Sequence, residues 1–75
     1  MDINSFVANF AEQFEDTDVN VIKADTKFHE IDEWSSLVAM GVIAMVKIRY
    51  GKTLSGTDLR ACVTVEDVYN LIMNK

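Results

Sequence analysis

The side chains that offer the most reactive chemistry in this chain are two adjacent serines, one histidine and one cysteine. Ser35 and Ser36 directly precede residues 37–46, a run with no polar side chain. A nucleophilic serine or cysteine needs a base within reach and a third group to orient that base. His29 is the only histidine, and nothing in the sequence places it beside Ser36 or Cys62. We therefore interpret neither pair as a catalytic site and predict no enzymatic activity.

A second candidate is a calcium loop, because Asp16, Asp18 and Asn20 imitate the alternating oxygen ligands with which such loops begin. The rest of the pattern fails. Val21 stands where the sharp turn needs glycine, and Lys27 stands where a bidentate glutamate is needed. We predict a solvated loop here and no metal site.

Size and composition limit what the chain can do. Its 75 residues are expected to form a single domain over residues 1–75, and a chain this short buries only about 60% of the surface that its unfolded form exposes. Function is therefore expected at the surface. With 49% hydrophobic and 25% charged residues, disorder is not expected. The lone cysteine and the lack of signal-peptide features at the start predict a cytoplasmic protein.

The charge argues against nucleic acid and membrane as partners. The net charge is −5, whereas binding to phosphate backbones requires clustered Lys and Arg. The ten apolar residues of 37–46 are too few to span a bilayer, so no stable membrane insertion is expected. The charge is also uneven: residues 1–36 hold nine acids and two bases, and residues 37–75 hold three acids and five bases. This polarity can orient an approaching partner.

Hydrophobic periodicity predicts the elements that position these residues. A first helix, capped by Asp2, follows from apolar residues at helical spacing: Ile3, Phe6, Val7, Phe10, Ala11 and Phe14. Residues 15–33 lose this period and are predicted to form a long loop, pinned to the core by Phe28 and Ile31.

A second helix is predicted from Ser35 to Tyr50, ended by Gly51. It is apolar all round, so one of two faces is a candidate contact surface: Ala39, Ile43, Val46 and Tyr50, or Val38, Gly41, Met45 and Ile48. A single turn at residues 57–61 and a last helix begun by a Thr64–Asp67 capping box follow. The predicted fold is all-α: a small four-helix bundle with three main helices, a short third helix and a long first loop.

The sequence resembles the acyl carrier proteins, a family of phosphopantetheine carriers, over nearly the whole chain. In that family a modified serine precedes a hydrophobic residue at the start of helix two, after a long first loop. The string Asp32-Glu33-Trp34-Ser35-Ser36-Leu37 has this form, and the Tyr50-Gly51 and Thr64–Asp67 segments also align. The resemblance implies that Ser36 bears a covalent 4'-phosphopantetheine. The free amides and positive dipole at a helix start suit such a phosphodiester.

The resemblance further implies a carrier that holds acyl or aminoacyl groups as thioesters and catalyses nothing itself. The implied partners are a phosphopantetheinyl transferase, an acyl- or aminoacyl-loading ligase, and downstream acyl-transfer or condensing enzymes. The sequence leaves the cargo open among a fatty acyl chain, a polyketide intermediate and an amino acid.

The chain departs from the family at two places. Ser35 stands where an aspartate is usual before the modified serine, and the second helix has none of the acidic residues that many fatty-acid carriers show to partners. We therefore predict docking through an apolar set, with Glu30, Asp32 and Glu33 steering: Trp34, Leu37, Val38, Gly41 and Met45. The alternative is a non-phosphopantetheinylated interaction module that binds a partner protein through its apolar second helix.

Overall fold

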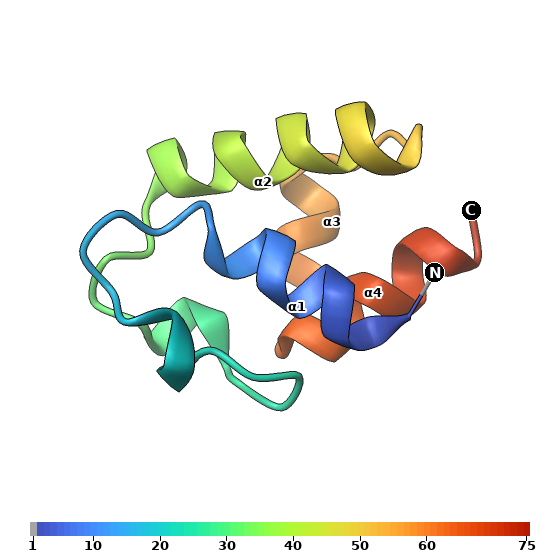
Figure 1. The fold of residues 1–75 in the computed structure, drawn as a ribbon. Helices are drawn as coiled ribbons and strands as arrows, with labels where there is room; N and C mark the ends of the chain where they lie inside the picture. The colour runs from blue at the N-terminus through green and yellow to red at the C-terminus, as the bar shows by residue number, and fades with distance from the viewer. Residues whose placement is uncertain (1) are drawn as a thin grey trace.

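A computed structural model describes residues 2–75, which form α-helices and 3₁₀ turns but no strand (Figure 1). The four α-helices are α1 (Ile3–Ala11), α2 (Ser36–Tyr50), α3 (Gly56–Ala61) and α4 (Val65–Met73). Two 3₁₀ turns, η1 (Val19–Val21) and η2 (Phe28–Glu30), lie in the long connection before α2. The prediction of an all-α chain is confirmed. Within residues 2–75 no helix is both long and apolar enough to cross a membrane.

The helices pack around one hydrophobic cluster. α1 lies against both α4 and α2, and the short α3 lies against α2 (Figure 1). The connection between α1 and α2 loops out at the end of the molecule where α2 begins (Figure 1).

Local capping explains where most helices begin. The Asp2 carboxylate accepts the N–H three residues on at 2.8 Å, and Thr64 and Asp67 form the predicted reciprocal capping box. Ser55 and Asp58 form a second capping box, at the start of α3, which the sequence analysis did not identify. Each of these caps satisfies backbone N–H groups that have no partner within the helix.

α1 ends at Ala11, one turn earlier than its apolar pattern suggests. A tighter turn follows, in which the Phe14 N–H donates to the carbonyl three residues back, that of Ala11, at 3.1 Å. Phe14 is still buried, so the turn keeps the predicted phenylalanine stripe in the core.

The centre of the core is aromatic. Phe10 is fully buried, and its ring centroid lies 5.3 to 6.3 Å from those of four other rings: Phe6, Phe14, Phe28 and Trp34. Such pairs add to stability beyond the area that they bury. Two of the four rings come from the connection before α2, so the cluster fixes that connection to α1.

The long connection is pinned at more points than the sequence suggested. Phe28 is fully buried and Ile31 partly buried, as predicted, and Ile22 is also buried. The backbone joins α4 as well: the Val65 N–H donates to the Thr26 carbonyl at 3.2 Å. A segment of this length is therefore held in one conformation by contacts at both ends and in the middle.

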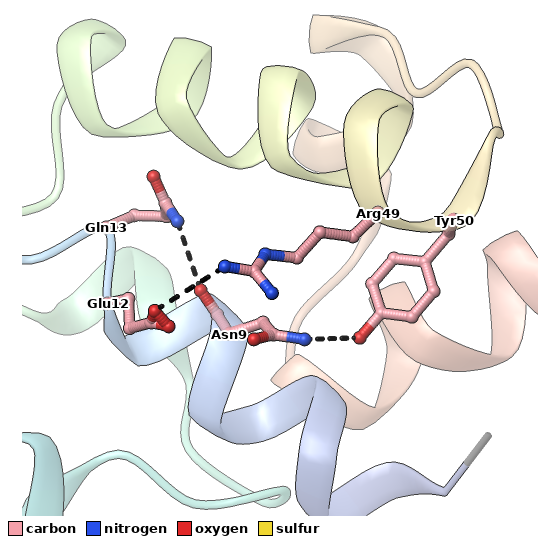
Figure 2. A network of polar contacts seen from close by, with 5 residues as sticks. All are labelled: Asn9, Glu12, Gln13, Arg49 and Tyr50. Atoms are coloured by element: carbon pink, nitrogen blue, oxygen red, sulfur yellow. Dashed lines mark hydrogen bonds and ion pairs between the residues drawn. The ribbon is translucent and has the colours of Figure 1, made fainter.

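A polar network ties the end of α1 to the end of α2 (Figure 2). The Asn9 amide donates to the Tyr50 hydroxyl at 2.7 Å, and the Gln13 amide donates to the Asn9 carbonyl at 3.1 Å. Arg49 lies 4.0 Å from Glu12, but both side chains are about half exposed. Exposed ion pairs contribute little, so the Asn9–Tyr50 bond is the stronger tie.

Gly51 ends α2 in the left-handed conformation, with φ of 66°, and its N–H donates to the Lys47 carbonyl. We expect Gly51→Ala to lower the free energy of unfolding by about 1 to 2 kcal/mol in urea denaturation, because a side chain strains this conformation. The control is Gly56→Ala in the first turn of α3, where the added methyl meets only the Arg60 side chain at 3.6 Å. This change should be neutral or slightly stabilising. Equal losses in both variants would contradict the assignment of Gly51 as the cap.

Candidate functional site

Ser35 and Ser36 have different environments at the start of α2. Ser35 is the N-cap, and its hydroxyl accepts the Val38 N–H at 3.4 Å. Ser36 is the first residue of the helix and is exposed, and its hydroxyl has no hydrogen bond to any of residues 2–75. The bulky core neighbours lie on the other side of the helix. Ser36 therefore offers a free hydroxyl to solvent, while Ser35 is used structurally.

A groove of about 340 Å³ lies beside Ser36, between α2, α3 and the end of the long connection. Its walls are mostly apolar: Trp34, Ala39, Met40, Ile43 and Leu59. It extends from Ser36 to Ile43, about 10 Å along the axis of α2. The free hydroxyl thus stands at one end of an apolar groove. The sequence could not show the groove, because it forms between segments that are distant along the chain.

His29 forms part of the groove wall and is held by the backbone. Its Nε2 lies 3.0 Å from the carbonyl oxygens of Leu59 and Cys62. Carbonyls only accept, so Nε2 carries a proton and donates. The ring also packs against Phe28 and Trp34. His29 fastens η2 to the end of α3, and its Nε2 is not available as a base for Ser36.

Cys62 is buried, and burial raises the pKa of its thiol, with the nearby Asp67 and Asp58 carboxylates adding to the effect. The thiol therefore stays protonated at neutral pH, and a protonated thiol is a poor nucleophile. Cys62 packs as a small hydrophobe, as its sequence neighbours suggested.

Glu33 holds the connection in place immediately before Trp34. Its carboxylate accepts hydrogen bonds from the Thr17 hydroxyl at 2.7 Å and from the N–H groups of Glu15 and Asp16 at 2.7 and 3.1 Å. The Thr17 hydroxyl and then these backbone N–H groups lower the pKa of Glu33. Glu33 was predicted to steer partners. In the structure its carboxylate instead accepts hydrogen bonds from the loop at residues 15–17. Its side chain closes the turn that leads into the candidate site.

Two of the five residues predicted for partner docking lie in the core. Val38 is 7% and Met45 5% exposed, so their side chains are not available at the surface, and this corrects the predicted docking surface. Gly41 is half-buried and faces α1, where an added Cβ would meet the Gln13 side chain. Trp34 is half-buried among aromatic rings. Leu37 alone is fully at the surface.

The exposed apolar residues of α2 form a different row, which we call the outer row: Leu37, Met40, Ala44 and Ile48. Leu37 is 79% and Ile48 82% exposed, and Met40 and Ala44 are also exposed. Spacings of three, four and four residues place them on one helical face. Neither face proposed from the sequence matches this row, because a helix that is apolar all round gives no signal for its outward side.

The outer row has opposite charges at its two ends. Glu30 and Asp32 are exposed near its start, where Ser36 lies, and Lys47 is exposed near its end. Leu37, the first member, directly follows Ser36 in the chain. An apolar contact surface therefore adjoins the free hydroxyl.

Asp18, one of the three residues that imitate a calcium loop, has a structural role in the long connection. The Asp18 carboxylate caps η1 by accepting the Asn20 N–H at 2.9 Å. Among residues 2–75 no group of three or more His, Cys, Asp or Glu side chains is placed to hold a metal ion. Asp18 thus serves the backbone of its own loop.

Comparison with known proteins assigns no family to the chain. No family model, curated protein or solved structure matches the chain. The functional interpretation therefore depends on Ser36, the groove and the outer row.

The Glu33 contact predicts a pH dependence of stability. The pKa of Glu33 is lowered from its usual 4.5 in the folded state, so its stabilisation is present above about pH 4.5 and is lost as the pH falls through the folded value. We expect Glu33→Gln to lower the melting temperature at pH 7, and the difference from the natural protein to shrink towards pH 3. Glu30→Gln is the control and should change little, because the exposed Glu30 carboxylate has no hydrogen bond to residues 2–75. A difference that stays constant with pH would contradict this role of the carboxylate.

Proposed function

We propose that this protein is a carrier of the acyl carrier protein type, which holds acyl or aminoacyl groups on a 4'-phosphopantetheine arm attached to Ser36. The observation that carries the proposal is the free, exposed hydroxyl of Ser36 at the first residue of α2 and at one end of an apolar groove. We also infer that the four helices form the small four-helix bundle of that family. The long first connection and the six-residue α3 support this inference.

The start of α2 fits the phosphodiester that the proposal requires. The N–H groups of Ser36 and Leu37 have no acceptor among residues 2–75, and the Ser35 hydroxyl accepts only the N–H of Val38. These free amides lie at the positive end of a 15-residue helix. Both features favour an anion attached at this position.

The chemistry at Ser36 belongs to partner enzymes. Transfer of phosphopantetheine from coenzyme A to the Ser36 hydroxyl releases adenosine 3',5'-bisphosphate and the hydroxyl proton. A phosphopantetheinyl transferase must supply the base, because His29 Nε2 is committed to two carbonyls. When attached, the arm supplies a terminal thiol that holds cargo as a thioester. The chain's own contributions are to position Ser36 and to offer an apolar groove beside it.

Partners are proposed to dock on the outer row, which adjoins Ser36 through Leu37. Apolar side chains exposed in a row are typical of protein contact sites. Exposed acids near Ser36 suit a partner with basic residues around its active site, and such charges act mainly on the rate of encounter. This surface would serve the transferase, the loading ligase and the downstream acyl-transfer or condensing enzymes in turn.

The attachment is tested by the intact mass after incubation with coenzyme A, magnesium and a broad-specificity phosphopantetheinyl transferase. We expect the natural protein to gain one phosphopantetheine and Ser36→Ala to gain none. Ser35→Ala is the matched control: it should still be modified, while losing about 1 kcal/mol of stability with its cap. If the natural protein gains no mass, the carrier proposal fails and the alternative of an interaction module that uses α2 alone is favoured.

The docking surface is tested by the rate of that same modification. We expect Met40→Glu and Ile48→Glu to lower kcat/KM of the transferase by about tenfold each, which corresponds to about 1.4 kcal/mol of lost contact. Val63→Glu makes the same change at an exposed apolar residue outside α2 and should leave the rate unaltered. Equal rates in all variants would exclude the outer row as the site that the transferase contacts.

A further inference from the structure

Arg60 is the one Lys or Arg side chain that lines the groove beside Ser36. Its one polar contact within residues 2–75 is with an uncharged group on the same helix: Nη2 donates to the exposed Thr57 hydroxyl at 3.1 Å. The other arginine, Arg49, lies 4.0 Å from Glu12. Within residues 2–75, Arg60 has no carboxylate partner, so its charge is unpaired next to the candidate site.

The groove itself has no acidic lining residue, although the chain has twelve acids and a net charge of −5. His29 and Arg60, its two basic lining residues, come from η2 and α3. A lining without carboxylates in so acidic a protein favours an anionic ligand over a cationic one.

The Arg60 guanidinium lies beside Gly56 at the groove wall. Arg60 Nη1 lies 3.6 Å from the position that a Cβ at Gly56 would occupy, so the group folds back over the first turn of α3. Gly56 is also a lining residue. Arg60 on α3 and Ser36 on α2 therefore line the same groove.

We propose that Arg60 binds the phosphodiester carried by Ser36 and so holds the start of the prosthetic arm against the groove. The inference rests on the proposed function, because the anion reaches the site only through attachment to Ser36. A guanidinium presents five N–H donors in a planar fork that matches two oxygens of a phosphate group. Thr57 accepts from one Nη2 N–H, and the remaining donors are free for the phosphate.

The charge distribution explains why such a partner is needed. Glu30 and Asp32 are exposed and precede Ser36 by six and four residues in the chain, so a phosphodiester adds a negative charge to a segment that is already acidic. The free amides of α2 offset part of this repulsion. Arg60, across the groove on α3, supplies a full positive charge. We therefore expect attachment of the arm to stabilise the protein and to fix α3 more firmly against α2.

The test compares the natural protein with Arg60→Gln, Arg60→Lys and Arg49→Gln, each before and after modification, with the extent of modification established by intact mass. Two quantities are measured: the change in melting temperature on modification, and the ³¹P chemical shift of the phosphodiester. We expect a rise in melting temperature for the natural protein and for Arg49→Gln. Arg60→Gln should lose most of this rise and shift the ³¹P resonance, with Arg60→Lys in between because an ammonium lacks the fork.

Each modified variant is compared with its own unmodified form, so any effect of the substitution on folding cancels. This inference is overturned if Arg60→Gln is modified normally and shows the same rise in melting temperature and the same ³¹P shift as the natural protein. That result does not contradict the proposed carrier function. An effect of Arg60 that appears only when the thiol bears a carboxylate-containing acyl group also overturns the assignment to the phosphate. No gain of mass in the natural protein overturns both proposals together.

Discussion

Phe10 packs in one aromatic cluster with Phe28 and Trp34, and the position of the candidate site depends on this contact. Phe28 and Trp34 lie in the later part of the long connection, and Trp34 directly precedes the two serines. Burying these rings against α1 fixes the point at which α2 begins, and with it the place of Ser36 beside α3. In a chain of 75 residues few other large side chains are available for this role.

Local signals in the sequence predicted the helices well. Ser35 and Gly51 bound α2 as expected, because a cap and a left-handed glycine act through their nearest neighbours. The Thr64–Asp67 box is equally local. The free Ser36 hydroxyl follows from the same reasoning, since a serine after a capping residue stands at the first turn of the helix and is left to solvent.

Contacts between distant segments could not be predicted in this way. His29 bonds to carbonyls 30 and 33 residues further on, and Glu33 closes on a turn that lies 16 to 18 residues back. The buried side of α2 was also hidden, because every side of that helix is apolar. Hence Val38 was expected at the surface but lies in the core. The outer row could be identified only from the exposure of its side chains in the structure. The groove and Arg60's place in its wall depend on where α3 folds, which no local pattern specifies.

Peptide mapping of the protein isolated from its own source tests whether Ser36 bears a phosphopantetheine arm in the cell. Trypsin cleavage after Lys27 and Lys47 yields a peptide that contains both Ser35 and Ser36. We expect this peptide to bear phosphopantetheine and its fragmentation to place the group on Ser36. A peptide that is wholly unmodified, or modified on Ser35, would contradict this expectation.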